Sequence, residues 1–329
     1  MAHPSPALPA GIELLAAVKP SPLLAPQLQA AFTVHERLHE TDPAAFAAAA
    51  PRIRAIAASG DSKVPASLIN ALPALEVIAV MGVGYDGVDV AAAKARGVVV
   101  THTPDVLNDD VADLALGLML SAARQLPAAD RWVRDGQWAR QGAMPLARKL
   151  SGARLGIVGI GRIGQAIAHR AQAFGMSVAY TARSARAGLA LAYLPNAEAL
   201  AAQSDYLVVI TPGGAATRHL IDAKVLAALG SEGILINVAR GSVVDEQALI
   251  EALEQGVIAG AALDVFEDEP RVPERLRALP QVVLSPHIGS ATRQTRQAMA
   301  DLTFANLRAH FSGQALPSPV PECRPATKG

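Results

Sequence analysis

The segment RLGIVGIGRIGQAIAHRAQAFG, residues 154–175, limits most strongly what this chain can fold into. A strand-like run meets Gly159, Gly161 and Gly164 and passes directly into a helix-like pattern. Gly159 permits a tight turn, Gly161 lets the backbone approach a phosphate, and Gly164 allows close helix-to-strand packing. Free amides at the start of the helix favour a bound anion. The segment therefore predicts a dinucleotide-binding site in a βαβ unit.

Strand-like and helix-like segments alternate on both sides of this motif. Before it, GIELLAAV is followed by LLAPQLQAAF, and LEVIAVMGVG by DVAAAKARG; after it come SVAYTARS, YLVVITP, GILINVARG, VIAGAALDVF and VVLSPHIGS. This alternation predicts βα units on parallel sheets. Further helices are expected at 109–125, 127–135 and 290–310. The proline-rich tail after Gly313 is expected to be poorly ordered.

The length of 329 residues favours two domains, because single hydrophobic cores usually stop growing before that size. We expect an α/β protein with two Rossmann-like or flavodoxin-like domains on parallel sheets. A nucleotide-binding domain, 104–288, would be inserted into a substrate-binding domain formed by 1–103 and 289–329, with crossings near Thr103 and Gly289. Substrate would bind in the cleft, and closure would exclude water.

Composition narrows the classes of partner and the compartment. The 29 basic and 29 acidic side chains cancel, so no overall field attracts nucleic acid or an anionic membrane. The longest apolar stretch, 114–123, is about half of what a membrane helix needs. The start, MAHPSPALPAG, lacks the pattern of a secretory signal. A single cysteine, Cys323, cannot form an internal disulfide, which suits the cytoplasm.

The strand that follows the fingerprint indicates which dinucleotide is bound. An NAD enzyme places an acidic residue there to bond the adenine ribose, but Thr181 occupies that position. Arg183, Ser184 and then Arg186 follow, and an arginine can bind a ribose 2′-phosphate with two charge-assisted bonds. We expect a preference for NADPH. The alternative is that these arginines form a solvated loop and that either cofactor is used.

Three further segments, NVARGSVVDEQAL, AALDVFEDEP and LSPHIGSAT, occur in this order after the fingerprint. Together with it they resemble the D-isomer-specific 2-hydroxyacid dehydrogenases over most of the chain. GVGYDGVDV and the TARS strand end resemble the glyoxylate and hydroxypyruvate reductase branch. The resemblance implies NADPH-dependent reduction of a small 2-ketoacid to the D-2-hydroxyacid by an oxidoreductase. Glyoxylate, hydroxypyruvate, a sugar-derived 2-ketoacid and an aryl pyruvate all remain open as substrates.

The resemblance assigns Arg240 to the substrate carboxylate and carbonyl, Glu269 to the histidine, and His287 to acid-base chemistry. A guanidinium can hold a carboxylate while polarising the neighbouring carbonyl, and a histidine can supply a proton near neutrality. A carboxylate beside the imidazole would raise its pKa. Each residue taken singly has an ordinary alternative: a solvated arginine, a member of an acidic loop, and a core histidine.

Other site residues also follow from the resemblance. The Val83 and Gly84 amides, with Arg240 and His287, would bind substrate. Asp264 would contact the nicotinamide amide, unless it caps the following turn. Trp138 would reach a partner subunit's active site or pack ordinarily, and 109–141 would supply much of a homodimer interface. The expected cofactor-binding residues are Asn108, Gly159, Gly161, Arg162, Ile163, Gly164, Thr181, Arg183, Ser184, Thr211, Pro212, Thr217, Val238, Ala239, Arg240, Asp264, His287 and Gly289.

Two other functions compete with this interpretation of the sequence. His35-Glu36-Arg37-Leu38-His39 fits the HExxH zinc pattern, which requires a helix. Strand-like Thr33 and Val34 precede it and Asp42-Pro43 starts a new element, so we expect no such helix and no metal site. A non-enzymatic NADP(H)-binding sensor or corepressor on the same fold is the second alternative, because fold does not fix function. It would bind nucleotide without turning over any 2-ketoacid.

Overall fold

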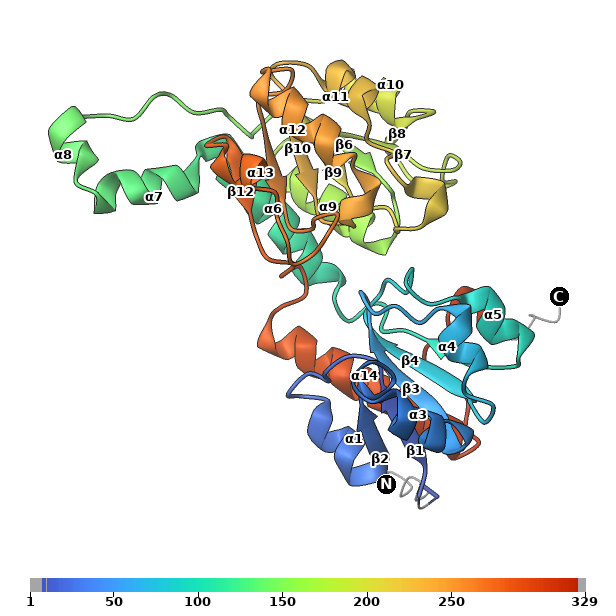
Figure 1. The fold of residues 1–329 in the computed structure, drawn as a ribbon. Coiled ribbons are helices and arrows are strands. Elements are labelled where there is room, and N and C mark those ends of the chain that lie inside the picture. Colours follow the sequence, from blue (N-terminus) through green and yellow to red (C-terminus); the bar gives the residue numbers. More distant parts are fainter. Residues whose placement is uncertain (1–7, 10, 325–329) are drawn as a thin grey trace, which may run out of the picture. The chain divides into compact units, whose positions relative to one another are not determined.

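A computed structural model of the chain describes residues 8–9 and 11–324. Most of the amino-terminal segment in which we expect no secretory signal lies outside these residues. The chain divides into two compact units, each formed around a parallel sheet (Figure 1). The first unit consists of the described residues up to Leu107 together with those from Thr292 onward. The second unit is Asn108–Ala291. These crossings lie a few residues beyond Thr103 and Gly289.

The first unit is built on a five-stranded sheet in the order β2-β1-β3-β4-β5, with every pair parallel. Its strands are β1 (Glu13–Ala16), β2 (Thr33–Glu36), β3 (Ile53–Ser59), β4 (Val77–Met81) and β5 (Val99–Thr101). Its helices are α1 (Ala25–Ala31), α2 (Leu38–Thr41), α3 (Pro43–Ala49), α4 (Ala66–Asn70), α5 (Val90–Ala95) and α14 (Arg293–Phe311), with 3-10 turns η1 (Ala50–Arg52) and η4 (Pro321–Cys323).

Burial explains the sequences of the central strands of this unit. All five residues of β4 are buried, as expected for a parallel strand covered on both faces. Asp42 and Asp89 begin α3 and α5 by accepting the amides of Ala45 and Ala92. These elements enclose a core that includes Ile56 and Ile78, each with no exposed surface.

The segment after Gly313 corrects one expectation. Residues 314–324 were expected to be poorly ordered, but Pro319 forms an antiparallel bridge with Thr101 at the end of β5. The Val320 amide donates to the Val100 carbonyl at 2.9 Å, and the Val320 side chain is fully buried in the core. Proline content misled the prediction because edge pairing and one buried apolar side chain fix this segment.

The second unit is built on a seven-stranded parallel sheet in the order β12-β11-β10-β9-β6-β7-β8. Its strands are β6 (Arg154–Val158), β7 (Ser177–Thr181), β8 (Ala192–Tyr193), β9 (Tyr206–Val209), β10 (Ile234–Asn237), β11 (Gly260–Leu263) and β12 (Val282–Leu284). Its helices are α6 (Asn108–Arg124), α7 (Leu126–Arg134), α8 (Gln137–Gln141), α9 (Arg162–Ala173), α10 (Ala197–Ala201), α11 (Ala223–Leu229), α12 (Glu246–Glu254) and α13 (Glu274–Ala278), with η2 (Ala215–Thr217) and η3 (Gly241–Val243).

The strand order of this sheet determines where a ligand can bind. The chain moves from β6 outward through β7 and β8, then returns to the other side of β6 with β9, β10, β11 and β12. In open α/β sheets, ligands bind beyond the carboxyl ends of the strands where this order reverses. The reversal here lies between β6 and β9, directly beside the glycine fingerprint.

Helices α7 and α8 stand away from the sheet of the second unit (Figure 1). Large apolar side chains lie exposed along this arm, residues 126–149, including Val133, Trp138 and Leu146, with Leu146 99% exposed. Across residues 8–9 and 11–324, no helix combines the length and the apolar character needed to cross a bilayer.

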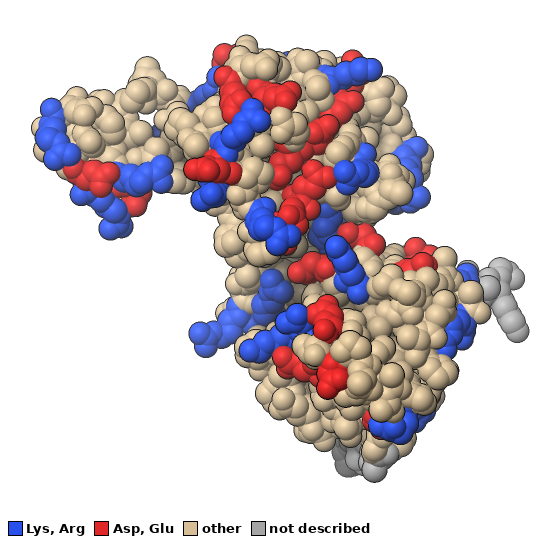
Figure 2. Space-filling view, viewed as in Figure 1, with Lys and Arg blue, Asp and Glu red and all other residues tan. Residues whose placement is uncertain are grey.

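The HExxH residues lie on two different elements, as the sequence predicts. His35 is on β2 and bonds the Glu13 carboxylate at 2.8 Å, Arg37 has a left-handed backbone, and His39 is on the four-residue helix α2. The described residues contain no group of three side chains placed to hold a metal ion. On the face drawn in Figure 2, both signs of charge occur on each unit, and acidic side chains gather over the second.

Candidate active site

The candidate site lies at the carboxyl edge of the seven-stranded sheet. Each of five adjacent strands, β6, β9, β10, β11 and β12, is followed at this edge by a segment that the sequence assigned to the site. Because the strands are parallel, their carboxyl ends meet at one edge. The sheet therefore brings residues that are more than a hundred positions apart in the chain into one region.

The three fingerprint glycines have different surroundings. Gly159 has a φ of +105°, and a Cβ there would lie 2.9 Å from the Ile210 backbone. A Cβ on Gly164 would lie 2.2 Å from the Gly159 carbonyl oxygen. Around Gly161, apart from its immediate neighbours along the chain, no described residue has an atom within 4 Å of the Cβ position. The turn is therefore closed by packing at Gly159 and Gly164 and open at Gly161, where a phosphate would approach the backbone.

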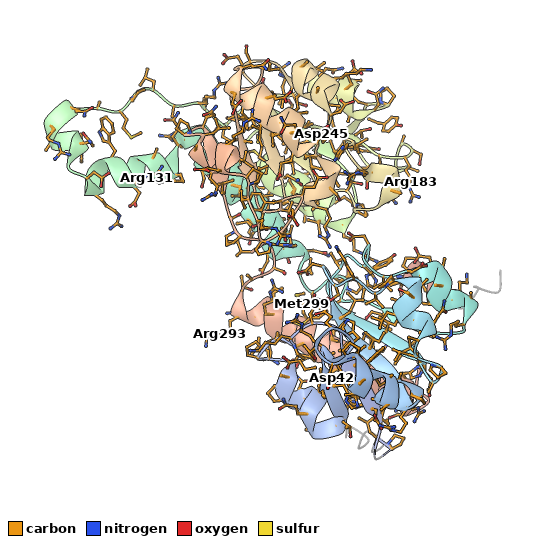
Figure 3. The ribbon with its side chains drawn as sticks, viewed as in Figure 1. Asp42, Arg131, Arg183, Asp245, Arg293 and Met299 are labelled. Atoms are coloured by element: carbon orange, nitrogen blue, oxygen red, sulfur yellow. The ribbon has the colours of Figure 1, made fainter. Side chains whose placement is uncertain are left out.

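The end of β7 lies directly against this turn. The Gly159 amide donates to the Thr181 carbonyl at 3.0 Å, and Thr181 is buried. Arg183 and Ser184 follow as exposed residues, and Figure 3 shows Arg183 on this loop of the second unit. The loop is anchored where the Arg186 amide donates to the Tyr180 hydroxyl. No carboxylate stands between Thr181 and Arg186, so the local charge is positive.

The remaining cofactor candidates lie along the same edge. Thr211 adjoins the Gly159 turn, and the Thr217 hydroxyl donates to the Pro212 carbonyl at 2.7 Å, which closes the loop after β9. Val238 and Ala239 are buried after β10. Asn108 begins α6, and Arg162 and Ile163 begin α9; Gly289 is buried, with its Cβ position 3.4 Å from Val111 of α6.

A histidine and a carboxylate are in direct contact at this edge. His287 Nδ1 lies 2.7 Å from Glu269 Oε2, and Glu269 Oε1 accepts the Phe266 amide at 3.0 Å. Both side chains are partly buried, 34% and 26% exposed. His287 has a φ of +52°, an uncommon backbone for a residue with a side chain. With Nδ1 directed at the carboxylate, Nε2 is the ring nitrogen on the opposite edge.

The pair shifts both pKa values in the direction that favours ionisation. The hydrogen bond to Glu269 raises the pKa of His287, against the opposing effects of burial and of the Arg240 charge. Burial acts to raise the pKa of Glu269, but the bonds from His287 and the Phe266 amide, together with the Arg240 charge, lower it overall. The contact therefore favours the protonated form of the imidazole and the ionised form of the carboxylate.

Arg240 stands in a rigid turn after β10. The Asn237 side chain accepts the Ala239 amide and donates to the Arg240 carbonyl, each at 3.0 Å, and Asn237 is 1% exposed. The Arg240 guanidinium donates to the Ala239 carbonyl at 2.8 Å. Its charge acts on both His287 and Glu269. Asn237 was not among the predicted site residues, although it begins the NVARG motif.

Asp264 holds the loop that carries His287. One carboxylate oxygen accepts the Ser285 hydroxyl at 2.6 Å and the Ile288 amide at 2.8 Å, and the other accepts the Gly289 amide at 2.8 Å. The His287 amide donates to the Asp264 carbonyl at 2.8 Å. The side chain thus caps the loop after β12, and not the turn that directly follows β11, which was the alternative considered for it.

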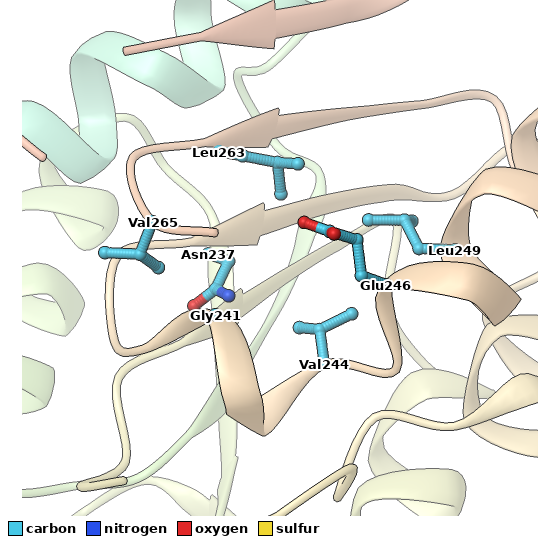
Figure 4. A pocket seen from close by; sticks show the side chains of 7 residues that line it. All are labelled: Asn237, Gly241, Val244, Glu246, Leu249, Leu263 and Val265. Atoms are coloured by element: carbon cyan, nitrogen blue, oxygen red, sulfur yellow. The ribbon is translucent and has the colours of Figure 1, made fainter. Parts of the chain in front are cut away.

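Sequence reasoning also missed Gly241. A Cβ at this position would lie 1.9 Å from the Phe266 carbonyl carbon, so the VARG turn packs directly on the loop that carries Glu269. Beside this contact lies a small hollow lined by Gly241, Val244 and Glu246 (Figure 4). In the sequence, only the glycine after Arg240 could have indicated this contact. A glycine at that position is equally typical of an ordinary turn.

The first unit holds the other predicted substrate-binding residues. Val83 and Gly84 follow β4, where the His102 ring bonds the Val83 carbonyl at 3.0 Å and the Thr103 amide donates to the Gly82 carbonyl at 2.8 Å. These bonds fix the loop that presents the two amides. Trp138, on α8, is 64% exposed and is not packed into the unit that carries it.

Comparisons with known proteins agree with this arrangement. Residues 116–289 match the family described as D-isomer specific 2-hydroxyacid dehydrogenase, NAD binding domain. The chain is 51% identical to a glyoxylate/hydroxypyruvate reductase A of Arabidopsis thaliana, covering 82% of this chain and 85% of that protein. It is 43% identical to a 2-ketogluconate reductase of Gluconobacter oxydans, covering 91% and 95%.

A solved structure is similar over nearly the whole chain. It is an NADPH-dependent glyoxylate/hydroxypyruvate reductase of Sinorhizobium meliloti in complex with NADP and malonate. The two chains are 48% identical, with a TM-score of 0.90, and the likeness covers 95% of this chain and 99% of that one. The resemblance inferred from the motifs is therefore confirmed at the level of family and fold.

Proposed function

Because the chain belongs to the D-isomer specific 2-hydroxyacid dehydrogenase family, we propose that it reduces a small 2-ketoacid to the D-2-hydroxyacid with NADPH, His287 being the general acid. The observation that carries this proposal is the 2.7 Å contact between His287 and Glu269 at the edge that bears the glycine fingerprint. Reduction turns the carbonyl oxygen into an alkoxide, which must receive a proton.

His287 is suited to supply that proton. Its Nδ1–H donates to Glu269, and this hydrogen bond raises the pKa of His287, which favours the protonated ring that reduction needs. Nε2–H is then the donor to the substrate oxygen. In the reverse reaction the neutral ring accepts the proton, so oxidation requires higher pH.

Arg240 is proposed to bind the substrate carboxylate and to polarise the carbonyl. Its turn is fixed by Asn237, so the guanidinium is presented with little freedom to lose on binding. The Val83 and Gly84 amides, presented by the loop that His102 holds, are proposed to donate to the substrate carboxylate.

The residues at the fingerprint fit a dinucleotide. Gly161 leaves open the position that a side chain would fill, and α9 begins there, where the first-turn amides of a helix point away from the helix's own carbonyls. When bound, the nicotinamide dinucleotide supplies the hydride. The residues proposed to hold it are those predicted along the edge from Gly159 to Gly289, with Asp264 acting through the loop that it caps.

NADPH preference is proposed from the loop after β7. Thr181 replaces the carboxylate that would repel a 2′-phosphate, and the exposed Arg183 and Ser184 are proposed to bind that phosphate. The solved relative in complex with NADP is described as NADPH-dependent, which supports the same preference here.

A panel of ketoacids tests the proposed function. Glyoxylate, hydroxypyruvate, 2-ketogluconate and an aryl pyruvate are each assayed with NADPH and with NADH, and kcat/KM is compared. We expect turnover with at least one ketoacid and a higher kcat/KM with NADPH. Nucleotide binding without turnover of any of the four would favour the sensor alternative, and a higher kcat/KM with NADH would overturn the cofactor preference.

Assembly and location are also proposals. Residues 109–141 are proposed to form much of a homodimer interface, which would cover apolar side chains exposed there, such as Val133 and Trp138. Trp138 is proposed to lie near the partner's site. The single cysteine is our ground for expecting a cytoplasmic enzyme.

A further inference from the structure

Backbone hydrogen bonds join two segments of the second unit, residues 218–221 and residues 242–245. The His219 amide donates to the Ser242 carbonyl at 2.9 Å, and the Ile221 amide to the Val243 carbonyl at 3.0 Å. The Asp245 amide donates in turn to the Ile221 carbonyl at 2.9 Å. The segment that leaves the cofactor-side loop, residues 218–221, is therefore fixed to the segment that follows Arg240.

A third segment, residues 264–269, which we call the catalytic loop, packs against these two segments. Phe266 lies against Gly241, as described above, and the Glu267 amide lies 3.4 Å from the Glu246 carboxylate. Figure 4 shows the Glu246 carboxylate beside Leu249 and Leu263, and burial there raises the pKa of Glu246. These contacts fix the backbone on one side of the catalytic loop.

The Glu267 side chain joins the catalytic loop to the cofactor-side segment. Its Oε1 accepts from the Arg218 guanidinium at 2.9 Å and lies 3.1 Å from His219 Nε2. His219 has a left-handed backbone with a φ of +50°, and its Nδ1 lies 3.8 Å from the Asp245 carboxylate. One carboxylate oxygen thus receives donors from two consecutive residues of another segment.

We propose that Glu267 is a positioning residue that couples the cofactor-side loop to the catalytic loop, through Arg218 and His219, and so sets the placement of Glu269 against His287. Glu267 is two residues before Glu269, and the amide of Phe266, the residue that precedes Glu267, donates to Glu269 Oε1. The inference rests on the proposed role of His287. It adds a residue that neither the motifs nor the comparisons assign.

A purely structural role for Glu267 can be distinguished from a positioning role by the pH dependence of reduction, but not by stability. Glu267 is 31% exposed and Arg218 is 57% exposed, and ion pairs of that exposure contribute little to stability. Stability therefore cannot distinguish the two roles. The pH dependence of reduction can, because it reports the pKa of His287, which faces the charges of Glu269, Arg240 and Asp264.

The test compares two glutamate-to-glutamine variants. Glu267→Gln removes the acceptor charge from this coupling, whereas Glu254→Gln removes it from the Glu254–Arg275 pair between α12 and α13. The pairs are matched, because the carboxylates are 31% and 37% exposed and each accepts from an arginine. Thermal unfolding of both variants provides the control for folding.

We expect Glu267→Gln to lower kcat for ketoacid reduction roughly tenfold, less than the ~10²-fold loss for a misplacement of about 1 Å. The alkaline limb of the pH profile of kcat should move to lower pH, which is the direction that we also expect for a Glu269→Gln variant. Arg218→Met should give the same change, and the double variant Glu267→Gln/Arg218→Met should be no worse than either single one, because both remove one coupling. Glu254→Gln should keep the wild-type profile.

The outcomes separate this inference from the proposed function. Glu267→Gln with the kcat and pH profile of Glu254→Gln would overturn the positioning role, while a His287→Ala variant without turnover would still support the proposed function. Retention of turnover by His287→Ala would overturn the proposed function itself. Additive losses in the double variant would show that Arg218 and Glu267 act separately, which also contradicts the coupling.

Discussion

At the scale of single residues, His287 combines a left-handed backbone with a ring nitrogen bonded to Glu269. Asp264 stabilises that backbone by accepting the amides of the next two residues. The motifs PHIG and EDEP, taken with the family resemblance, allowed the histidine and its carboxylate partner to be predicted. They could not predict the positive φ or the capping, because both depend on β11 and β12 lying side by side.

The pair should control the pH dependence of reduction. Reduction requires the imidazolium, so the rate falls as pH rises through the His287 pKa, which Glu269 raises. Glu269→Gln removes that contribution, and the alkaline limb of kcat/KM should move to lower pH. The measurement is the pH profile of kcat/KM for wild type and variant. An unchanged limb would show that another group titrates.

Cofactor choice should depend on one side chain in the loop after β7. Hydrogen bonds between charged groups contribute about 1.5–3 kcal/mol, so Arg183→Ala should lower kcat/KM for NADPH roughly 10- to 100-fold. The value for NADH should change little, because NADH has no 2′-phosphate. Arg277→Ala, on α13, is the control for loss of an exposed arginine. Equal losses with both cofactors would contradict phosphate binding.

At the scale of elements, the alternation of strands and helices was sufficient to predict both parallel sheets. The helices predicted at 109–125 and 290–310 correspond to α6 and α14 within a few residues. Contacts between loops were beyond prediction, because they depend on which strands become neighbours. Gly241 shows this most clearly: its sequence neighbours do not indicate that Phe266, 25 positions away, lies against it.

That contact should be sensitive to a single added methyl group. In Gly241→Ala, the Cβ would meet the Phe266 backbone, and overpacking of this kind costs about 1–3 kcal/mol. The melting temperature should fall by several degrees, and kcat should fall because the Arg240 turn and the Glu269 loop are forced apart. Thermal unfolding and steady-state kinetics measure the two effects.

Gly117→Ala is the matched control for this substitution. Gly117 lies within α6, where no described atom outside its chain neighbours and the nearby backbone of its own helix is within 4 Å of its Cβ position, and alanine is a better helix former than glycine. The control should keep wild-type kinetics. Wild-type stability and activity in Gly241→Ala would show that the two loops tolerate separation.

At the scale of the whole molecule, two units share the work that the sequence assigns to them. The second unit carries the fingerprint, Arg240, Glu269 and His287, and the first carries Val83 and Gly84. The interruption of the first unit by the second was predictable from the order of the motifs. The residues at which the chain passes from one unit to the other were less predictable, because they fall within segments that have no distinct composition.

The exposed arm predicts association of two copies. Val133, 57% exposed on α7, should be covered in a homodimer, so Val133→Asp should shift the protein toward monomer in sedimentation equilibrium. Phe174→Asp, at an exposed apolar position after α9, should leave the association state unchanged. A monomeric wild-type protein would contradict the predicted interface.

The most direct measurement is the turnover of His287→Ala with a ketoacid that the wild-type protein reduces, alongside titration of NADPH binding. General acid catalysis contributes typically 10²–10⁴-fold, so kcat should fall by about that factor. The Kd for NADPH should change much less than kcat, because most of the residues proposed to hold the dinucleotide lie elsewhere along the edge, at the fingerprint turn and in the loop after β7. Wild-type turnover in this variant would contradict the assignment of His287 as the proton donor.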